Sequence, residues 1–335
     1  METELWPTHT PELFARAVER AAALLRAGEV VAVPTETVYG LAALATRPEA
    51  VRRLFEVKGR PSANPVIVHV ADLALARACV SAWPPAAEAL ARAFWPGPLT
   101  LVLPRAPAIP PEVTAGGPTV GIRWPRHPFI QALIQACGEP LAAPSANVST
   151  ALSPTEAAHV LKSLGGRIPA VVDGGPCPVG IESTVLDLTT QPPRILRPGM
   201  VHAGALAAVV GEVQTGGAAG AAGPLRSPGL LAKHYAPRAR LRVLAWRDEA
   251  DLRQQVAALG EEPGRTFVLA HGCLPAPGGW GGVSVIPQEA EAFARALYAE
   301  LHRCDEHGAA AIVVEAVPET PEWAAVADRL RRAAG

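Results

Sequence analysis

The sequence predicts an α/β protein made of two parts, and three observations support this fold class. Short apolar runs of strand type and longer stretches with helical spacing of apolar residues intermix along the first 210 residues. A Gly/Ala-rich stretch at 211–223 interrupts this pattern, and strands and helices begin again after Pro237. Because the first part lacks strict alternation, we expect a twisted mixed sheet with flanking helices there, followed by a smaller Rossmann-like domain.

The elements of the first part follow from periodicity and from their end signals. The helix at 11–27 begins with Pro11 and stops at Gly28, and the helix at 48–58 stops at Gly59. Further helices are predicted at 73–80, 86–94, 128–136 and 154–164. Strands are predicted at 30–33, 66–70, 99–103, 120–123, 141–143, 170–173, 183–187 and 194–197.

The second part has its own set of elements. Strands are predicted at 241–245, 266–270, 283–286 and 310–315, and helices at 249–259, 288–306 and 322–333. It lacks the G-x-G-x-x-G pattern, so we expect no nucleotide site of its own there. The predicted domains are 8–210 and 238–335, with a linker at 211–237.

Composition excludes several classes of protein. An apolar fraction of 49% with 18% charged residues describes a globular chain, and a net charge of −1 gives little support to direct binding of a nucleic acid. The five cysteines form no C-x-x-C pair, which predicts reduced thiols in a cytoplasmic protein. The N-terminus lacks a secretory apolar segment, and no apolar stretch is long enough to span a membrane.

Polar residues adjoin the two apolar runs at 30–33 and 66–70. Thr37 follows the first run, and Lys58, Arg60 and Asn64 precede the second, which contains His69. We expect these side chains at one edge of a sheet, where open α/β sheets bind ligands. A Lys and an Arg two residues apart suit an anionic, phosphate-bearing ligand, although a solvated charged loop is the alternative.

Further short motifs place small or polar residues beside Pro or Gly at predicted strand ends. They lie at 94–100, 119–125, 142–147, 153–155, 180–185 and 195–199. Taken in this order, the segments resemble the YrdC-like family over about residues 10–205, and the segment at 227–237 resembles the linker of its long-form members. The resemblance implies a YrdC-like core fold and a threonylcarbamoyl-AMP synthase, which condenses L-threonine, bicarbonate and ATP and releases pyrophosphate.

The resemblance also implies roles for individual residues. Lys58 and Arg60 match catalytic positions. ATP contacts are expected from Arg60, Asn64, Thr119, Ser145, Ser153, Arg197 and Tyr235. Threonine contacts are expected from Thr37, His69, Arg123, the backbone at Ala143, and Ser183. Mg²⁺ is expected with ATP and no separate metal site, and the product would pass to a tRNA threonylcarbamoyl transferase.

Alternatives remain for several residues and for the function. His69 also fits a core histidine, Ser153 fits a helix N-cap with Glu156 as its capping-box partner, and Cys177 fits a buried filler. Glu182 is either structural or a magnesium ligand. A carbamoyl-adenylate-forming carbamoyltransferase and a non-enzymatic binder of double-stranded RNA are the competing functions. We also expect the 227–237 segment to act as a lid over the nucleotide site.

Overall fold

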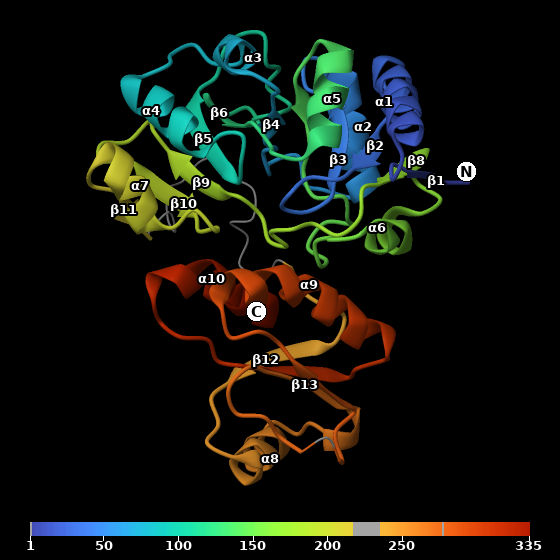
Figure 1. Cartoon of the computed structure of the whole chain (residues 1–335), viewed down its shortest axis with the longest axis vertical. Coiled ribbons are helices and arrows are strands. Elements are labelled where there is room, and N and C mark those ends of the chain that lie inside the picture. The colour runs from blue at the N-terminus through green and yellow to red at the C-terminus, as the bar shows by residue number, and fades with distance from the viewer. Residues whose placement is uncertain (1, 217–234, 277) are drawn as a thin grey trace. The chain divides into compact units, whose positions relative to one another are not determined.

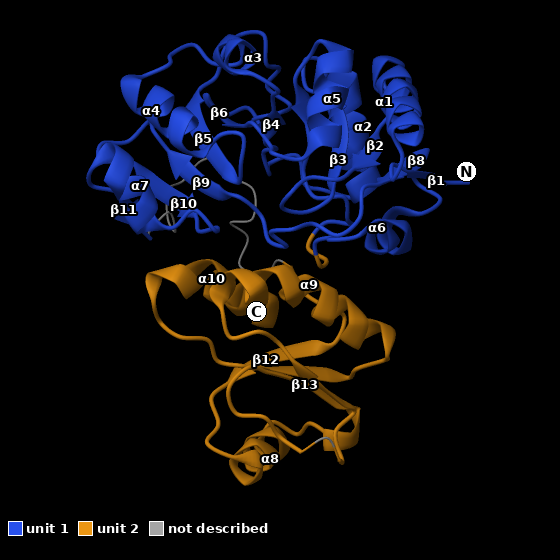
Figure 2. Cartoon of the chain, in the orientation of Figure 1, with its two compact units in different colours: residues 1–149, 153–230 blue, residues 150–152, 231–335 orange. Residues whose placement is uncertain are grey.

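The computed structural model describes residues 2–216, 235–276 and 278–335. The chain divides into two compact units, shown in different colours in Figure 2. The N-terminal unit comprises Met1–Ser149 and Ser153–Leu230, and the C-terminal unit comprises Thr150–Leu152 and Leu231–Gly335. No helix in the described ranges is both long enough and apolar enough to cross a membrane.

The N-terminal unit is built on a mixed sheet, as the sequence predicts. Its described strands run in the order β1-β8-β2-β3-β7-β4-β6-β5-β9-β10-β11, with parallel and antiparallel neighbours (Figure 1). Their bounds are β1 Glu4–Pro7, β2 Val31–Val33, β3 Gly40–Leu44, β4 Val68–His69, β5 Leu99–Pro104, β6 Thr119–Arg123, β7 Leu141–Ala142, β8 Ala170–Asp173, β9 Thr184–Asp187, β10 Arg194–Arg197 and β11 Gln214–Thr215.

Helices flank this sheet. They are α1 Pro11–Arg26, α2 Pro48–Lys58, α3 Leu73–Ala78, α4 Pro85–Phe94, α5 Pro128–Cys137, α6 Ala157–Leu164 and α7 Ala203–Val210. Local sequence sets their ends. Thr10 caps α1 by accepting a hydrogen bond from the Leu13 backbone N–H, and Gly59 ends α2 in the left-handed region with φ 58°.

The two faces of the sheet are covered differently. On one face, apolar residues of α1 and α5 pack on β2, β3, β7 and β8. On the other face, residues of α2, α4, α6 and α7 form a second and larger core with the alternate residues of these strands and of β4, β5, β6 and β9. Alternation of side chains across strands explains why each strand contributes to both sides. The first face continues over β4, β6, β5 and β9, and that region carries the candidate site.

Several sequence predictions need correction. The strands β1 and β3 are additional to the predicted set, and Gln214–Thr215, predicted as linker, pairs with β10 as β11. The helix predicted from residue 154 begins at Ala157. Glu156 is its N-cap residue and makes no side-chain capping bond, so the predicted capping box is wrong. The hydroxyl group of Ser153 instead donates to Glu182.

The C-terminal unit contains a four-stranded parallel sheet in its described residues, in the order β12-β15-β13-β14. Figure 1 shows α9 and α10 on one face and α8 on the other. The bounds are β12 Arg240–Leu244, α8 Glu249–Ala258, β13 Thr266–Ala270, β14 Gly282–Val285, α9 Ala290–Glu306, β15 Ala311–Glu315 and α10 Ala324–Ala334, with short 3₁₀ turns at Pro263–Arg265 and Pro321–Trp323. This confirms the predicted smaller α/β domain.

At the carboxyl ends of β13 and β15, the position where open α/β sheets bind ligands is occupied by the side chain of Glu315. After β13 the chain continues to β14, whereas after β15 it continues to α10, which packs on β12. Connections that leave adjacent strands in opposite directions mark the ligand crevice of open α/β sheets. Here the backbone N–H groups of His271, Gly272 and Cys273 donate to the Glu315 carboxylate at 2.7, 2.8 and 3.0 Å.

Candidate functional site

Strand register brings the polar residues of the candidate site onto one face of the N-terminal sheet. His69 of β4 is paired with Arg123 of β6, and Thr119 lies on the same face as Arg123 because the two are four residues apart in one strand. On β5, Thr100 is paired with Val185 of β9. The sequence places these residues at a sheet edge, whereas the structure places them along a face.

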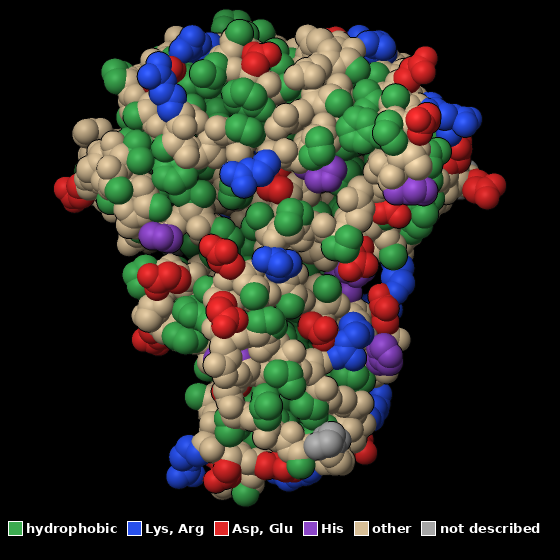
Figure 3. Space-filling view, viewed as in Figure 1, with side chains coloured by type: hydrophobic (Ala, Val, Ile, Leu, Met, Phe, Trp, Pro, Cys, Tyr) green, Lys and Arg blue, Asp and Glu red, His purple; other side chains and the backbone are tan. Residues whose placement is uncertain are grey.

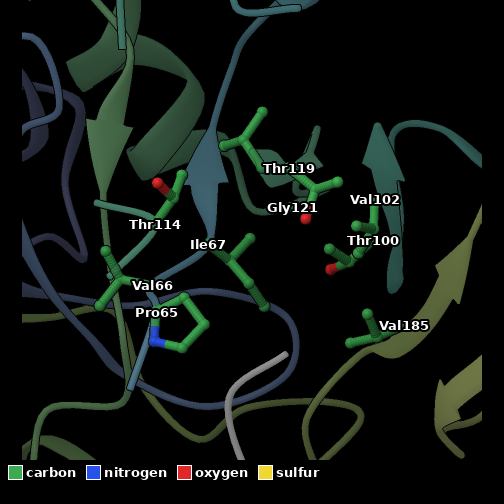
Figure 4. A pocket seen from close by; sticks show the side chains of 10 residues that line it. Pro65, Val66, Ile67, Thr100, Val102, Thr114, Thr119, Gly121 and Val185 are labelled. Carbon is green, nitrogen blue, oxygen red and sulfur yellow. The ribbon is translucent and has the colours of Figure 1, made fainter. Parts of the chain in front are cut away.

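A pocket lies on this face. It is lined by Pro65, Val66, Ile67, Thr100, Val102, Thr114, Thr119, Val120, Gly121 and Val185. Figure 4 shows the β5 side chains of Thr100 and Val102 beside Thr119 and Gly121 of β6, with Ile67 between them and Pro65. An apolar floor with a few hydroxyl groups suits a partly apolar ligand such as a nucleobase.

Lys58, at the end of α2, is buried and fixes a loop. Its Nζ donates to the backbone oxygen of Ser145 at 2.5 Å and also to the backbone oxygen of Asn147. Burial, and to a lesser degree the neighbouring Arg60, lowers the pKa of Lys58 well below its ordinary value. Lys58 therefore holds the loop after β7, which carries Ser145.

Arg60 and Asn64 belong to the segment between α2 and β4. The guanidinium group of Arg60 is buried and donates to the backbone oxygens of Asn64 at 3.1 Å and Pro65 at 2.8 Å. The side-chain amide of Asn64 is 2% exposed, and both its nitrogen and its oxygen lack a hydrogen-bond partner among the described residues. Buried amides are normally satisfied, so this amide is a strong candidate for ligand contact.

Arg123 is the centre of a second group of polar residues. Its Nη1 donates to Thr37 Oγ1 at 2.9 Å, its Nε donates to the Gly97 backbone oxygen at 3.3 Å, and its Nη2 lies 2.7 Å from Glu36 Oε1. The last contact is an ion pair without hydrogen-bond alignment. The sequence analysis assigns no role to Glu36, which lies between two threonines three positions after the end of β2.

His69 is a neutral imidazole at the same face. Burial, with a smaller contribution from Arg123, lowers its pKa to about 3. Its Nδ1 has no hydrogen-bond partner within the described ranges. A neutral imidazole can offer both a donor and an acceptor, which suits a hydroxyl group better than an anion.

Two hydroxyl groups of the predicted set are held by buried partners. Ser183 Oγ lies 2.8 Å from Thr100 Oγ1 and accepts a hydrogen bond from Arg197 Nη2 at 3.1 Å. Ser153 Oγ donates to Glu182 Oε1 at 2.5 Å. Thr100 ends the motif at 94–100, but the sequence analysis assigns it no role, because its contact with Ser183 depends on strand pairing.

The remaining predicted residues are placed as follows. Ala143 follows β7, and its backbone N–H donates to the Ile67 oxygen at 3.1 Å. Tyr235 belongs to the C-terminal unit, where its ring lies 6.0 Å from Tyr298 and 5.3 Å from the guanidinium carbon of Arg329. The predicted lid residues 227–234 lie outside the described residues. Cys177 is buried, and burial raises the pKa of its thiol, which fits a packing role.

Comparisons with known proteins cover both units. A family model described as "Telomere recombination" matches residues 23–199. A second, described as "Threonylcarbamoyl-AMP synthase, C-terminal domain", matches residues 201–335. Together the two models account for nearly the whole chain, in the order in which the two parts occur.

Individual relatives are similar over nearly their full length. The threonylcarbamoyl-AMP synthase of Pyrococcus abyssi is 40% identical over 94% of this chain and 93% of its own length. That of Bacillus subtilis is 41% identical over 95% and 93%. The crystal structure of P. abyssi Sua5 complexed with L-threonine matches with a TM-score of 0.90 at 37% identity, covering 100% of this chain and 98% of that one.

Proposed function

This chain belongs to the threonylcarbamoyl-AMP synthase family, and we propose that it condenses L-threonine, bicarbonate and ATP into threonylcarbamoyl-AMP and pyrophosphate. The observation that carries this proposal is the similarity to synthases over both units, at 40% and 41% identity. A neighbour solved in complex with L-threonine supports the threonine substrate. The enzyme is thus a nucleotidyltransferase that uses ATP and threonine.

We assign the two substrates to the two groups of polar residues. Threonine would contact Thr37, His69, Arg123, the Ala143 backbone and Ser183. ATP would contact Arg60, Asn64, Thr119, Ser145, Ser153, Arg197 and Tyr235. The geometry that supports this division is the buried guanidinium group of Arg123 beside Thr37, and the unsatisfied amide of Asn64 beside Arg60. A guanidinium fork suits the two oxygens of the threonine carboxylate.

The proposed chemistry proceeds without a covalent enzyme intermediate. The threonine amine attacks the carbon of bicarbonate, and water leaves to give N-carboxythreonine. The new carboxylate then attacks the α-phosphorus of ATP, and pyrophosphate leaves. Mg²⁺ would enter with ATP and offset phosphate charge, and Glu182, which accepts a hydrogen bond from Ser153, is the carboxylate that would contact it if it serves as a ligand. Lys58 and Arg60 fix the surrounding loops, so the protein contributes positioning and electrostatics.

Two finer proposals concern the cellular setting. We propose a cytoplasmic enzyme whose product passes to a transferase that modifies tRNA. All five cysteines are free thiols, which supports a reducing compartment. A net charge of −1 supports little direct binding to tRNA.

The test is an activity assay of the full chain. With ATP, Mg²⁺, L-threonine and bicarbonate, the protein should release pyrophosphate and an AMP-containing product, and omission of threonine or bicarbonate should abolish most turnover. Full activity with carbamoyl phosphate in place of bicarbonate would favour the carbamoyltransferase chemistry instead. Tight, salt-sensitive binding of double-stranded RNA without any turnover would favour the non-enzymatic function.

A further inference from the structure

Glu36 is a buried acid at the candidate threonine site with no assigned role. It follows β2, and its backbone oxygen accepts a hydrogen bond from the Val179 N–H at 2.8 Å, which fixes the turn. Its side chain is 4% exposed, and Oε1 lies 2.7 Å from Arg123 Nη2. Neither carboxylate oxygen has an aligned hydrogen bond from any part of the chain that the structure describes.

This environment is incomplete for a carboxylate. The charge of Glu36 is balanced by Arg123, but its oxygens can accept about four hydrogen bonds between them. Leaving a buried charged acceptor without donors is costly, so native proteins normally satisfy such groups. A ligand group that carries several N–H or O–H donors and a positive charge would satisfy both oxygens.

The neighbouring groups narrow the ligand further. The guanidinium group of Arg123 is oriented by Thr37 and the Gly97 backbone oxygen, and it lies against Glu36. An α-amino acid carries a carboxylate and an ammonium group on the same carbon atom. A guanidinium group and a carboxylate that lie side by side can therefore bind these two groups together, the guanidinium the carboxylate and the carboxylate the ammonium group. An ordinary structural ion pair would instead be expected to align its hydrogen bonds.

We propose that Glu36 is a further substrate ligand that binds the α-ammonium group of L-threonine, while Arg123 binds the α-carboxylate. This inference rests on the proposed function. It adds an amine-specific residue to the site and positions the nitrogen atom, which attacks bicarbonate after its ammonium form has released a proton to solvent. The site then discriminates amino acids from hydroxy acids by charge as well as by shape.

Binding of three ligands to the full chain, measured by calorimetry, tests the assignment. L-Threonine has both charged groups, 3-hydroxybutanoate lacks the amine, and L-threonine amide lacks the carboxylate. The variant Glu36→Gln should weaken binding of threonine and of the amide about tenfold to a hundredfold, and leave 3-hydroxybutanoate within about twofold. Arg123→Gln should weaken threonine and 3-hydroxybutanoate but not the amide. Glu139→Gln, at a partly exposed acid, is the matched control for loss of one carboxylate.

Different binding results would contradict different parts of the proposal. Equal losses for threonine and 3-hydroxybutanoate in Glu36→Gln would show that Glu36 acts only through Arg123, and unchanged threonine affinity would remove it from the site. Thermal unfolding of each variant monitors folding. If Glu36→Gln does not fold, Glu36→Asp keeps the charge but shortens the side chain, so it should weaken binding of threonine and of the amide and leave 3-hydroxybutanoate within about twofold. Absence of threonine binding by the unchanged protein would overturn the proposed function itself.

Discussion

Lys58 Nζ lies 2.5 Å from the backbone oxygen of Ser145, so a buried amine at the end of α2 fixes the loop that follows β7. Asn147 in the same loop accepts a second hydrogen bond from this nitrogen. A residue predicted as catalytic from its motif thus has a clear structural task in the protein. Ser145 would be misplaced without it.

Replacing Lys58 by Met should destabilise the protein and weaken ATP binding together. The loss of the donor leaves two backbone oxygens unsatisfied, at a cost of about 2–4 kcal/mol. Urea unfolding and ATP titration measure the two effects. Arg16→Met, at an exposed cation of α1, is the control and should change neither by more than about 0.5 kcal/mol. An unchanged stability in Lys58→Met would show that these oxygens find other donors.

The buried bond between Ser153 and Glu182 should appear as an energetic coupling. Because their oxygens are 2.5 Å apart and the residues are 0% and 7% exposed, a double-mutant cycle of Ser153→Ala and Glu182→Gln should give about 1–3 kcal/mol. The free energies of unfolding of the four proteins provide the number. Additive effects would contradict a direct interaction.

Measuring turnover at several Mg²⁺ concentrations would show whether Glu182→Gln raises the concentration of Mg²⁺ that the enzyme requires.

Arg60 and Asn64 should differ when truncated. Arg60→Ala removes internal hydrogen bonds to two backbone oxygens, so it should reduce the stability of the protein. It should also weaken ATP binding by about one to two decades, because a charge-assisted contact contributes about 1.5–3 kcal/mol. Asn64→Ala removes an amide that has no partner in the described ranges and should reduce ATP affinity with little loss of stability. Calorimetric titration with ATP and thermal unfolding distinguish the two. A large destabilisation by Asn64→Ala would place that amide in the folded framework instead.

His69 should make the protein less stable in acid. Its folded-state pKa of about 3 lies below the unfolded value of about 6.5, so its contribution is fully present above pH 6.5 and is lost as the pH falls toward 3. At pH 5 the loss should be about 2 kcal/mol relative to pH 7. Urea unfolding at both pH values measures it. His69→Gln should remove this part of the pH dependence, and an identical dependence in the variant would assign it to other groups.

The boundary of the N-terminal unit can be tested by truncation. A chain that ends at Gly216 keeps β11, which pairs with β10 through Gln214 and Thr215, whereas a chain that ends at Gly211 loses it. We expect the longer version to unfold at a higher temperature, because Gln214 also accepts hydrogen bonds from Arg194. Both should bind threonine but turn over poorly, since the predicted lid is absent. Turnover at the full-length rate would contradict the lid.

Much of the fold could be predicted from the sequence, because the signals are local. Pro48 and Gly59 delimit α2, so its predicted and observed bounds agree. In contrast, β3 consists of Gly40–Leu44, all five residues of which are buried, so it shows no alternation of apolar and polar positions. In β1 only Trp6 is buried, which gives no strand pattern either. The strand β1 pairs with β8, which is distant in sequence, whereas β3 lies between the nearby β2 and the distant β7.

The candidate site was predictable only as a set of residues. Motifs identified Arg123, Ser153 and Ser183, but not what each side chain contacts. Ser153 and Glu182 are 29 residues apart, and a capping box within one segment was the simpler local interpretation. Glu36 was omitted because its significance depends on Arg123, which reaches it through tertiary packing. Partners of this kind follow from sheet register, which short motifs do not encode.

In the C-terminal unit, the Glu315 carboxylate occupies the position at which an anionic ligand from solution would bind to the backbone N–H groups. Three consecutive amide donors, His271 to Cys273, are satisfied by a group that is covalently part of the chain. A ligand taken from solution stabilises a protein only in proportion to its concentration. A tethered one has a high effective concentration that does not change with the surroundings. The backbone at 271–273 is therefore held by a group whose effective concentration is independent of the anions in solution.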